Sequence, residues 1–190
     1  MFKNQDILKI HENKTSLSIS DCFKKRFSPK FFVNSNISDD DLKIIFEAVR
    51  WTPSSYNRQP WYFYVAKNGS KGFEKLSSLL MQGNLWAKNA GVLILGCYIN
   101  KDDYGENAYA QYDLGQAVAT LVYQAQILDY YTHQMGGFNK DKAKKLVDEN
   151  HQPWVMIALG KLGDYAKAPN DILESDKKPR IRKNDVFEII

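Results

Sequence analysis

Residues 53–61 read PSSYNRQPW, and this stretch decides how the rest of the chain is interpreted. Its two prolines restrict the backbone, so that ordering the loop costs less conformational entropy than ordering a flexible connector. Ser54, Ser55 and Asn57 offer hydroxyl and amide groups that suit a polyol or the amide edge of a ligand. Two interpretations stand at this point: a polar loop that caps the next element, or a preorganised cradle for a ligand with many hydroxyl groups.

The segments on either side of this loop have clear patterns. Ser38 is placed to cap a helix that begins in the run of aspartates at 39–41, whose charges suit the positive end of a helix dipole. Apolar residues at helical spacing continue this helix, and Pro53 ends it. Residues 61–66 then read as a strand.

Hydrophobic periodicity predicts five further elements along the chain. The apolar run near residue 95 is continuous, so we expect that strand to be buried on both faces. The predicted helices fall at about 71–82, 106–133 and 139–149, and the predicted strands at 91–98 and 154–159.

Length and charge exclude several classes of protein. The chain has 190 residues, which indicates one domain, and 26 Lys and Arg against 22 Asp and Glu give a net charge of +4. That balance permits a small anionic ligand, but the scattered basic residues do not form a nucleic-acid footprint. The longest apolar run is far shorter than the ~20 residues that span a bilayer. Cys22 and Cys97 have no metal-ligand spacing, and two unpaired thiols fit a reducing compartment, so we expect a cytoplasmic protein. The charge pattern and the short apolar run lead us to expect no nucleic-acid or membrane partner.

The sequence lacks the usual self-sufficient catalytic arrangements. The three histidines at 11, 133 and 151 form no metal-ligand pair, so no metal site is predicted, and neither cysteine has a nucleophile signature. Phosphate-binding glycine motifs of the GxGxxG or Walker type are also missing from the sequence. An enzyme built on this chain would therefore take its reactivity from a cofactor.

Two shorter segments are further candidates for ligand binding. Gly136 and Gly137 allow a flat ligand to approach the backbone closely, although paired glycines also end helices, and both interpretations can hold together. Arg180 and Arg182 alternate in an extended segment, which puts their guanidinium groups on one side, as phosphate binding requires. The apolar end of the chain, residues 185–190, is expected to lie on a partner subunit as an added strand.

In order and spacing, PSSYNRQPW, MGGF and RIRK resemble the nitroreductase family of FMN-dependent oxidoreductases, over roughly residues 20–187. The resemblance implies an α+β sandwich with a central mixed β-sheet flanked by helices, and an intertwined homodimer with FMN at its interface. It further implies that 1–190 is a single domain, that 1–19 is an N-terminal extension, and that 170–190 is an arm reaching the partner subunit.

The resemblance also assigns roles to individual residues. It implies that a loop donated by the partner subunit, with Pro53, Ser54, Ser55 and Asn57, contacts the flavin and its ribityl chain. It assigns the pyrimidine edge of the flavin to Asn84 and its N5 and O4 side to Gly136 and Gly137. The phosphate would be bound by Arg180 and Arg182.

The N-terminal motif departs from the family pattern. Lys25 keeps a basic position, and the resemblance gives it an electrostatic role beside the flavin. Asp21 stands where the family has a phosphate-binding arginine, and Phe23 removes a hydroxyl group. Lys24 or Arg26 is available as a substitute.

The implied function is an FMN-dependent oxidoreductase that takes hydride from NADH or NADPH. It would reduce nitroaromatic, quinone or similar small-molecule acceptors with ping-pong kinetics, because reductant and acceptor would use the same face of the flavin. The departures at Asp21 and Phe23 keep an alternative open, a non-catalytic member of the family that binds FMN for storage or sensing.

Overall fold

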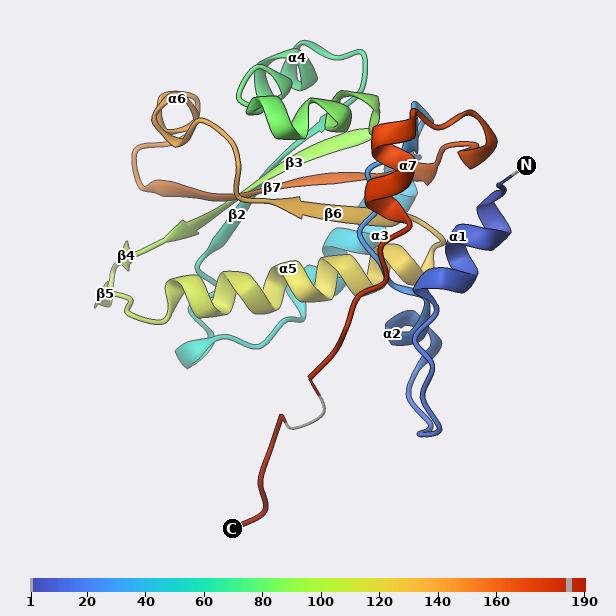
Figure 1. The fold of residues 1–190 in the computed structure, drawn as a ribbon. Helices are drawn as coiled ribbons and strands as arrows, with labels where there is room; N and C mark the ends of the chain where they lie inside the picture. The colour runs from blue at the N-terminus through green and yellow to red at the C-terminus, as the bar shows by residue number, and fades with distance from the viewer. Residues whose placement is uncertain (1, 184–185) are drawn as a thin grey trace.

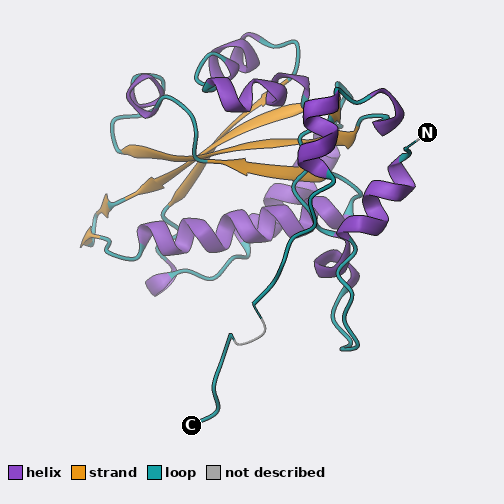
Figure 2. Ribbon diagram, in the orientation of Figure 1, coloured by secondary structure: helices purple, strands orange, loops and turns teal. Residues whose placement is uncertain are grey.

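The computed structural model describes residues 2–183 and 186–190, and its centre is a β-sheet with helices on both faces (Figures 1 and 2). The strands of the sheet run in the order β1-β7-β3-β2, with β6 also paired to β7, and β4 and β5 form a separate hairpin. The strands are β1 (Phe32–Val33), β2 (Trp61–Lys67), β3 (Val92–Ile99), β4 (Lys101–Asp102), β5 (Gly105–Glu106), β6 (Tyr131–Met135) and β7 (His151–Leu162).

All strand pairs within the described part of the chain are antiparallel, so the prediction of a mixed sheet is wrong. The prediction that β3 is buried on both faces is confirmed, with Leu93 and Ile94 fully inaccessible to solvent. A continuously apolar strand is typical of parallel sheets. Here the double burial arises because helices cover both faces of an antiparallel sheet, and the apolar pattern does not encode strand direction.

Alternating side chains of β3 divide the core into two clusters. Leu93 and Leu95 point to one face, covered by α4 (Lys71–Ser77), the 3₁₀ segment η2 (Gln82–Asn89) and α6 (Lys140–Lys144). Val92 and Ile94 point to the other face, covered by α3 (Asp39–Arg50) and α5 (Ala110–Ile127). We call these the η2 face and the α5 face; α4 and α6 lie above the sheet in Figure 1, and α5 lies below it.

The predicted cap of the first long helix is confirmed. The Ser38 hydroxyl accepts a hydrogen bond from the backbone N–H of Asp41 at 3.0 Å, and α3 ends at Arg50, shortly before Pro53. The other predicted helices are shorter than expected, since α4 and α6 each end several residues early and η2 follows as a 3₁₀ helix.

The prediction of one helix from about 106 to 133 is wrong at its end. Helix α5 stops at Ile127, and Asp129 adopts a left-handed backbone conformation with φ of 57°. The Lys161 ammonium donates to the carbonyl oxygens of Leu128 and Asp129, which satisfies carbonyls at the helix end. The chain then turns back and pairs with β7 as β6.

The N-terminal helix and the segment around residues 165–176 pack together on a third cluster. Ile7 of α1 (Asn4–His11) lies fully buried against Phe27 and Tyr165, so the expected N-terminal extension begins with a helix packed on the body. The Tyr165 hydroxyl donates to Asp176 Oδ2 at 2.6 Å, where α7 (Asn170–Asp176) ends. The remaining short helices are α2 (Asp21–Lys25), η1 (Ser55–Asn57) and η3 (Tyr165–Lys167). No helix in the described ranges is long and apolar enough to cross a membrane.

Candidate functional site

The PSSYNRQPW loop lies on the α5 face. The backbone N–H of Ser55 donates to Asp113 Oδ2 in α5 at 3.1 Å, and the Ser54 hydroxyl accepts from the backbone N–H of Gln59 at 2.9 Å. Among the residues that the structure describes, the Ser55 hydroxyl and the Asn57 side-chain amide have no hydrogen-bond partner. The loop therefore presents a hydroxyl and an amide that remain available to a ligand.

The backbone of this loop is held in an unusual conformation. Tyr56, Asn57 and Gln59 have φ angles of 52°, 54° and 48°. This left-handed region disfavours residues with a Cβ, and such conformations persist where the surrounding structure fixes them.

Gly136 and Gly137 lie on the η2 face. They follow β6 directly, so the interpretation as a helix C-cap is wrong, and they lie beside Asn84. The Asn84 Nδ2 donates to the Gly137 carbonyl oxygen at 2.9 Å, and the backbone N–H of Met81 donates to the same oxygen at 3.3 Å. Neither glycine N–H donates a hydrogen bond to another described residue. A Cβ built on Gly136 would meet nothing within 4 Å, which leaves open space over the backbone.

The loop and the glycine pair lie on opposite faces of the sheet. Phe138 and Met135, which flank the glycines, belong to the core of the η2 face, whereas Trp61 and Phe63 after the loop pack into the core of the α5 face. Figure 1 shows the sheet and α5 between them. A single chain therefore cannot bring both segments to one ligand.

Arg180 and Arg182 line a cavity of about 250 Å³ together with Arg26 and His11. Burial lowers the pKa of Arg26, and the neighbouring charges of Arg182 and Arg180 lower it further. Within the described ranges, no carboxylate forms an ion pair with any of the three guanidinium groups. Glu12 lines the same cavity, but the three guanidinium groups around it outnumber this one carboxylate, and such a cluster suits a phosphate group.

Lys25 lies elsewhere. Its ammonium group is 3.3 Å from Asp21 Oδ2, both side chains are largely exposed, and Lys25 lines a separate cavity with Asp129 and Tyr131. The Phe23 ring packs at 4.3 Å from the ring of Tyr123. The structure thus brings Arg26, rather than Lys25, together with Arg180 and Arg182.

Sequence reasoning did not single out Asp113, although it holds the loop. Its side chain is 1% exposed, and it is the one charged residue in the otherwise uncharged sequence of α5. A carboxylate on the apolar side of a buried helix is costly unless it is paired or hydrogen-bonded. A single charged residue in an otherwise uncharged helix is the sequence signal that could have identified Asp113.

Residues 23–90 match the sequence profile of the Nitroreductase family. An uncharacterised 15.4 kDa protein of Mycolicibacterium smegmatis is 38% identical over 111 residues, covering 58% of this chain and 76% of that protein. A protein of Archaeoglobus fulgidus provisionally named NADH dehydrogenase/NAD(P)H nitroreductase is 25% identical over 170 residues, covering 84% of this chain and 94% of that one. A solved structure described as an oxidoreductase containing FMN superposes with a TM-score of 0.85, at 31% identity and 94% coverage of both chains.

Proposed function

From the premise that this chain belongs to the nitroreductase family of flavin-dependent oxidoreductases, we propose that two copies hold FMN between them and reduce a small acceptor with NADH or NADPH. The acceptor class is a nitroaromatic, a quinone or a similar compound. The observation that carries the two-chain site is the placement of the PSSYNRQPW loop and the glycine pair on opposite faces of one sheet.

The residues present fit the three chemical parts of FMN. The side-chain-free backbone at Gly136, with open space over it and N–H groups that donate to no described residue, fits the edge of a flat ring system. The polar groups of Ser55 and Asn57, which have no partner in the described part of the chain, fit a ribityl chain. The cavity lined by Arg26, Arg180 and Arg182 fits the phosphate. When bound, FMN supplies the hydride chemistry, which no arrangement of side chains predicted from the sequence provides.

The chain's own residues would orient and stabilise the cofactor. The N–H groups of Gly136 and Gly137 would donate to the side of the ring that takes part in hydride transfer. Asn84 uses its Nδ2 on the Gly137 carbonyl, which leaves its carbonyl oxygen free to accept from the imide edge of the ring. Lys25 would add positive charge beside the ring, since its exposed pair with Asp21 is weak enough to exchange.

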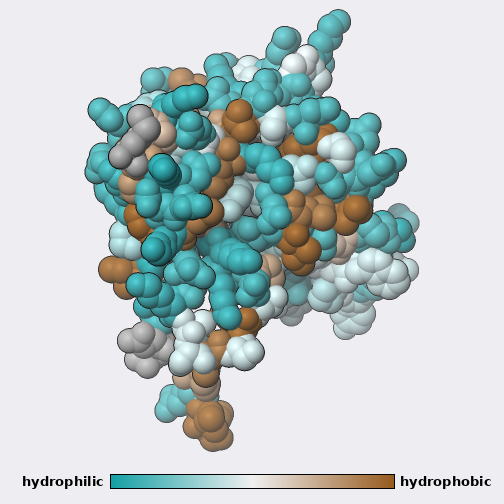
Figure 3. All heavy atoms as spheres, turned by 90° about the vertical axis from the view of Figure 1, so that its right-hand side faces the viewer, coloured by the Kyte–Doolittle hydropathy of each residue, from teal (hydrophilic) through white to brown (hydrophobic). Residues whose placement is uncertain are grey.

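A homodimer follows from the same geometry, because the loop of one copy must reach the glycines of the other. Residues 186–190 support it: Phe187 and Ile189 are 80% and 89% exposed, and Figures 1 and 3 show this segment projecting from the body. Asp185, at the start of the predicted docking segment, lies outside the described residues. We propose that the segment docks on the partner beside β2, an edge strand of the sheet, where Phe46 and Trp61 line an open groove of about 530 Å³.

Reconstitution of the purified protein with FMN tests this function. We expect one FMN per chain, rapid bleaching of the flavin absorption by NADH or NADPH, and recovery on adding a quinone or nitroaromatic. Parallel double-reciprocal plots would support the shared site and ping-pong order. Bound flavin that no nicotinamide reduces would instead support the storage or sensing alternative, and failure to bind FMN would contradict both.

A further inference from the structure

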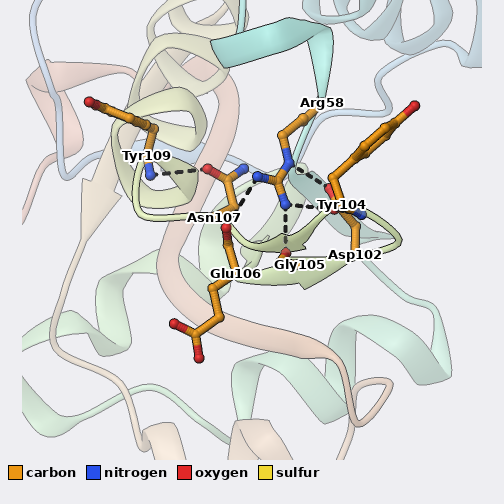
Figure 4. A network of polar contacts seen from close by, with 7 residues as sticks. All are labelled: Arg58, Asp102, Tyr104, Gly105, Glu106, Asn107 and Tyr109. Atoms are coloured by element: carbon orange, nitrogen blue, oxygen red, sulfur yellow. Dashed lines mark hydrogen bonds and ion pairs between the residues drawn. The ribbon is translucent and has the colours of Figure 1, made fainter.

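One side chain, Arg58, fixes the PSSYNRQPW loop to the β4–β5 hairpin (Figure 4). Its Nε and Nη2 donate to the two carboxylate oxygens of Asp102 at 2.8 and 2.6 Å. Nη2 also donates to the Gly105 carbonyl oxygen at 2.7 Å, and Nη1 donates to that of Glu106 at 3.2 Å. The side chain is only 11% exposed, so these are well-shielded contacts.

The geometry of this contact is specific to arginine. A guanidinium group offers a planar fork that matches a carboxylate, and lysine cannot reproduce that fork. Hydrogen bonding from Arg58 lowers the pKa of Asp102, so this carboxylate remains charged at neutral pH. Asp102 also accepts from the backbone N–H of Tyr104 at 2.9 Å, which ties the same carboxylate to the turn of the hairpin.

Arg58 lies within the part of the loop whose backbone is least favourable. Asn57 precedes it and Gln59 follows it, both with positive φ, while Arg58 itself has an ordinary φ of −73°. Strained backbone conformations persist only where neighbouring contacts over-determine them. The hydrogen bonds of Arg58 join this strained stretch to the hairpin, while the hydrogen bond from Ser55 to Asp113 joins the start of the loop to α5.

We propose that the Arg58–Asp102 pair is a positioning device for cofactor binding: it holds Ser55 and Asn57 in the conformation that meets FMN. The β4–β5 hairpin thereby becomes part of the binding site without touching the ligand. This inference rests on the proposed FMN site. Arg58 and Asp102 are positioning residues, because they act through the loop.

Equilibrium binding of FMN to full-length variants tests the inference, with flavin fluorescence quenching as the readout. We expect Arg58→Lys and the isosteric Asp102→Asn each to weaken FMN binding on the order of tenfold, as loss of a charge-assisted contact predicts. The double variant should bind about as weakly as either single variant, because both changes remove the same interaction. Asp103→Asn is the matched control: it removes the same charge from the same turn, and Asp103 makes no described contact with Arg58.

Visible circular dichroism at saturating FMN separates positioning from general stability. A displaced loop should change the dichroism of the bound flavin in Asp102→Asn but not in Asp103→Asn. If Asp102→Asn lowers only the melting temperature and leaves both FMN affinity and dichroism at wild-type values, the inference is overturned and the proposed function stands. If the wild-type protein itself binds no FMN, the proposed function fails first.

Discussion

The side-chain Nδ2 of Asn84 lies 2.9 Å from the carbonyl oxygen of Gly137 and donates a hydrogen bond to it. The same nitrogen would lie 2.8 Å from a Cβ placed on Gly137, which is closer than real Cβ contacts allow. Asn84 and Gly137 are therefore a matched pair, in which the absence of a side chain at one position allows the hydrogen bond made by the other.

Gly137→Ala should displace the Asn84 amide and lower both stability and FMN affinity. The lost hydrogen bond alone accounts for about 0.5–1.5 kcal/mol of unfolding free energy. For stability, Gly136→Ala is the control, since its methyl group meets nothing within 4 Å. In urea unfolding of the apo proteins, the midpoint of Gly136→Ala should equal that of the wild type, and the midpoint of Gly137→Ala should be lower. Equal midpoints for the two variants would refute the pairing.

Arg26→Gln should weaken FMN binding without lowering the stability of the apo protein. Removing one of the three guanidinium groups that line this cavity takes away a proposed phosphate contact and should weaken FMN binding about 10- to 100-fold. The apo protein should be at least as stable as the wild type, because Arg26 is held beside like charges with its pKa lowered mainly by burial. Arg50→Gln, which removes an exposed arginine paired with Glu47, should change neither quantity.

The two cysteines should differ in reactivity. Burial raises the pKa of Cys97 to about 12, and its side chain is fully inaccessible, whereas Cys22 is partly exposed. Because the thiolate is the reacting form, iodoacetamide at mildly alkaline pH should modify one cysteine in the native protein and two in the unfolded protein. Modification of Cys97 without unfolding, seen by peptide mass mapping, would contradict the packing of β3.

Stability should fall on mild acidification because of two histidines. Burial is the main cause that lowers the pKa of both His133 and His151 below the ordinary value of 6.5. Below that value the unfolded chain binds protons that the folded chain does not, so unfolding free energy is lost as pH falls. Urea midpoints should therefore decrease from about pH 7.5 to about pH 5.5. The double variant His133→Gln/His151→Gln should show a flatter profile over this window; an unchanged slope would remove the histidines from the explanation.

Ile189→Asp should weaken the proposed dimer. The Ile189 side chain is 89% exposed, and a charge there would oppose docking on an apolar groove. Sedimentation of the wild type should show twice the chain mass of 21.9 kDa, with the variant shifted toward that mass at low concentration. Glu188→Gln is the neighbouring control. A wild type that sediments only as the single chain would contradict the shared site.

Local chemistry could be predicted from the sequence, and long-range geometry could not. The hydroxyl of Ser38 and the Asp39–Asp41 run specify a helix start by contacts within four residues, and that prediction is confirmed. The end of α5 was missed because it depends on Lys161, more than thirty residues away, which donates to the last carbonyls. Antiparallel pairing was likewise hidden, since β3 has the same apolar sequence in either direction.

The phosphate end of the candidate site also combines a local feature that the sequence predicts with a long-range one that it does not. Alternation in the sequence placed Arg180 and Arg182 on one side of an extended segment, and both line one cavity. Forked geometry favours Arg26 over the two lysines beside it, but the sequence alone did not show which of these three adjacent side chains faces Arg180 and Arg182. The buried Phe27 fixes the direction of these side chains through its packing with Tyr165 and Ile7.

The left-handed residues of the PSSYNRQPW loop have a consequence for engineering. Replacing Tyr56, whose ring is 94% exposed, with glycine would relieve an unfavourable backbone conformation without disturbing packing. Stabilised variants selected only for heat resistance would therefore tend to accumulate changes in this loop. Such variants risk losing turnover as they gain thermal tolerance, so a directed-evolution campaign on this scaffold would do better to leave residues 53–60 untouched and seek stability on the surfaces of α3 and α6.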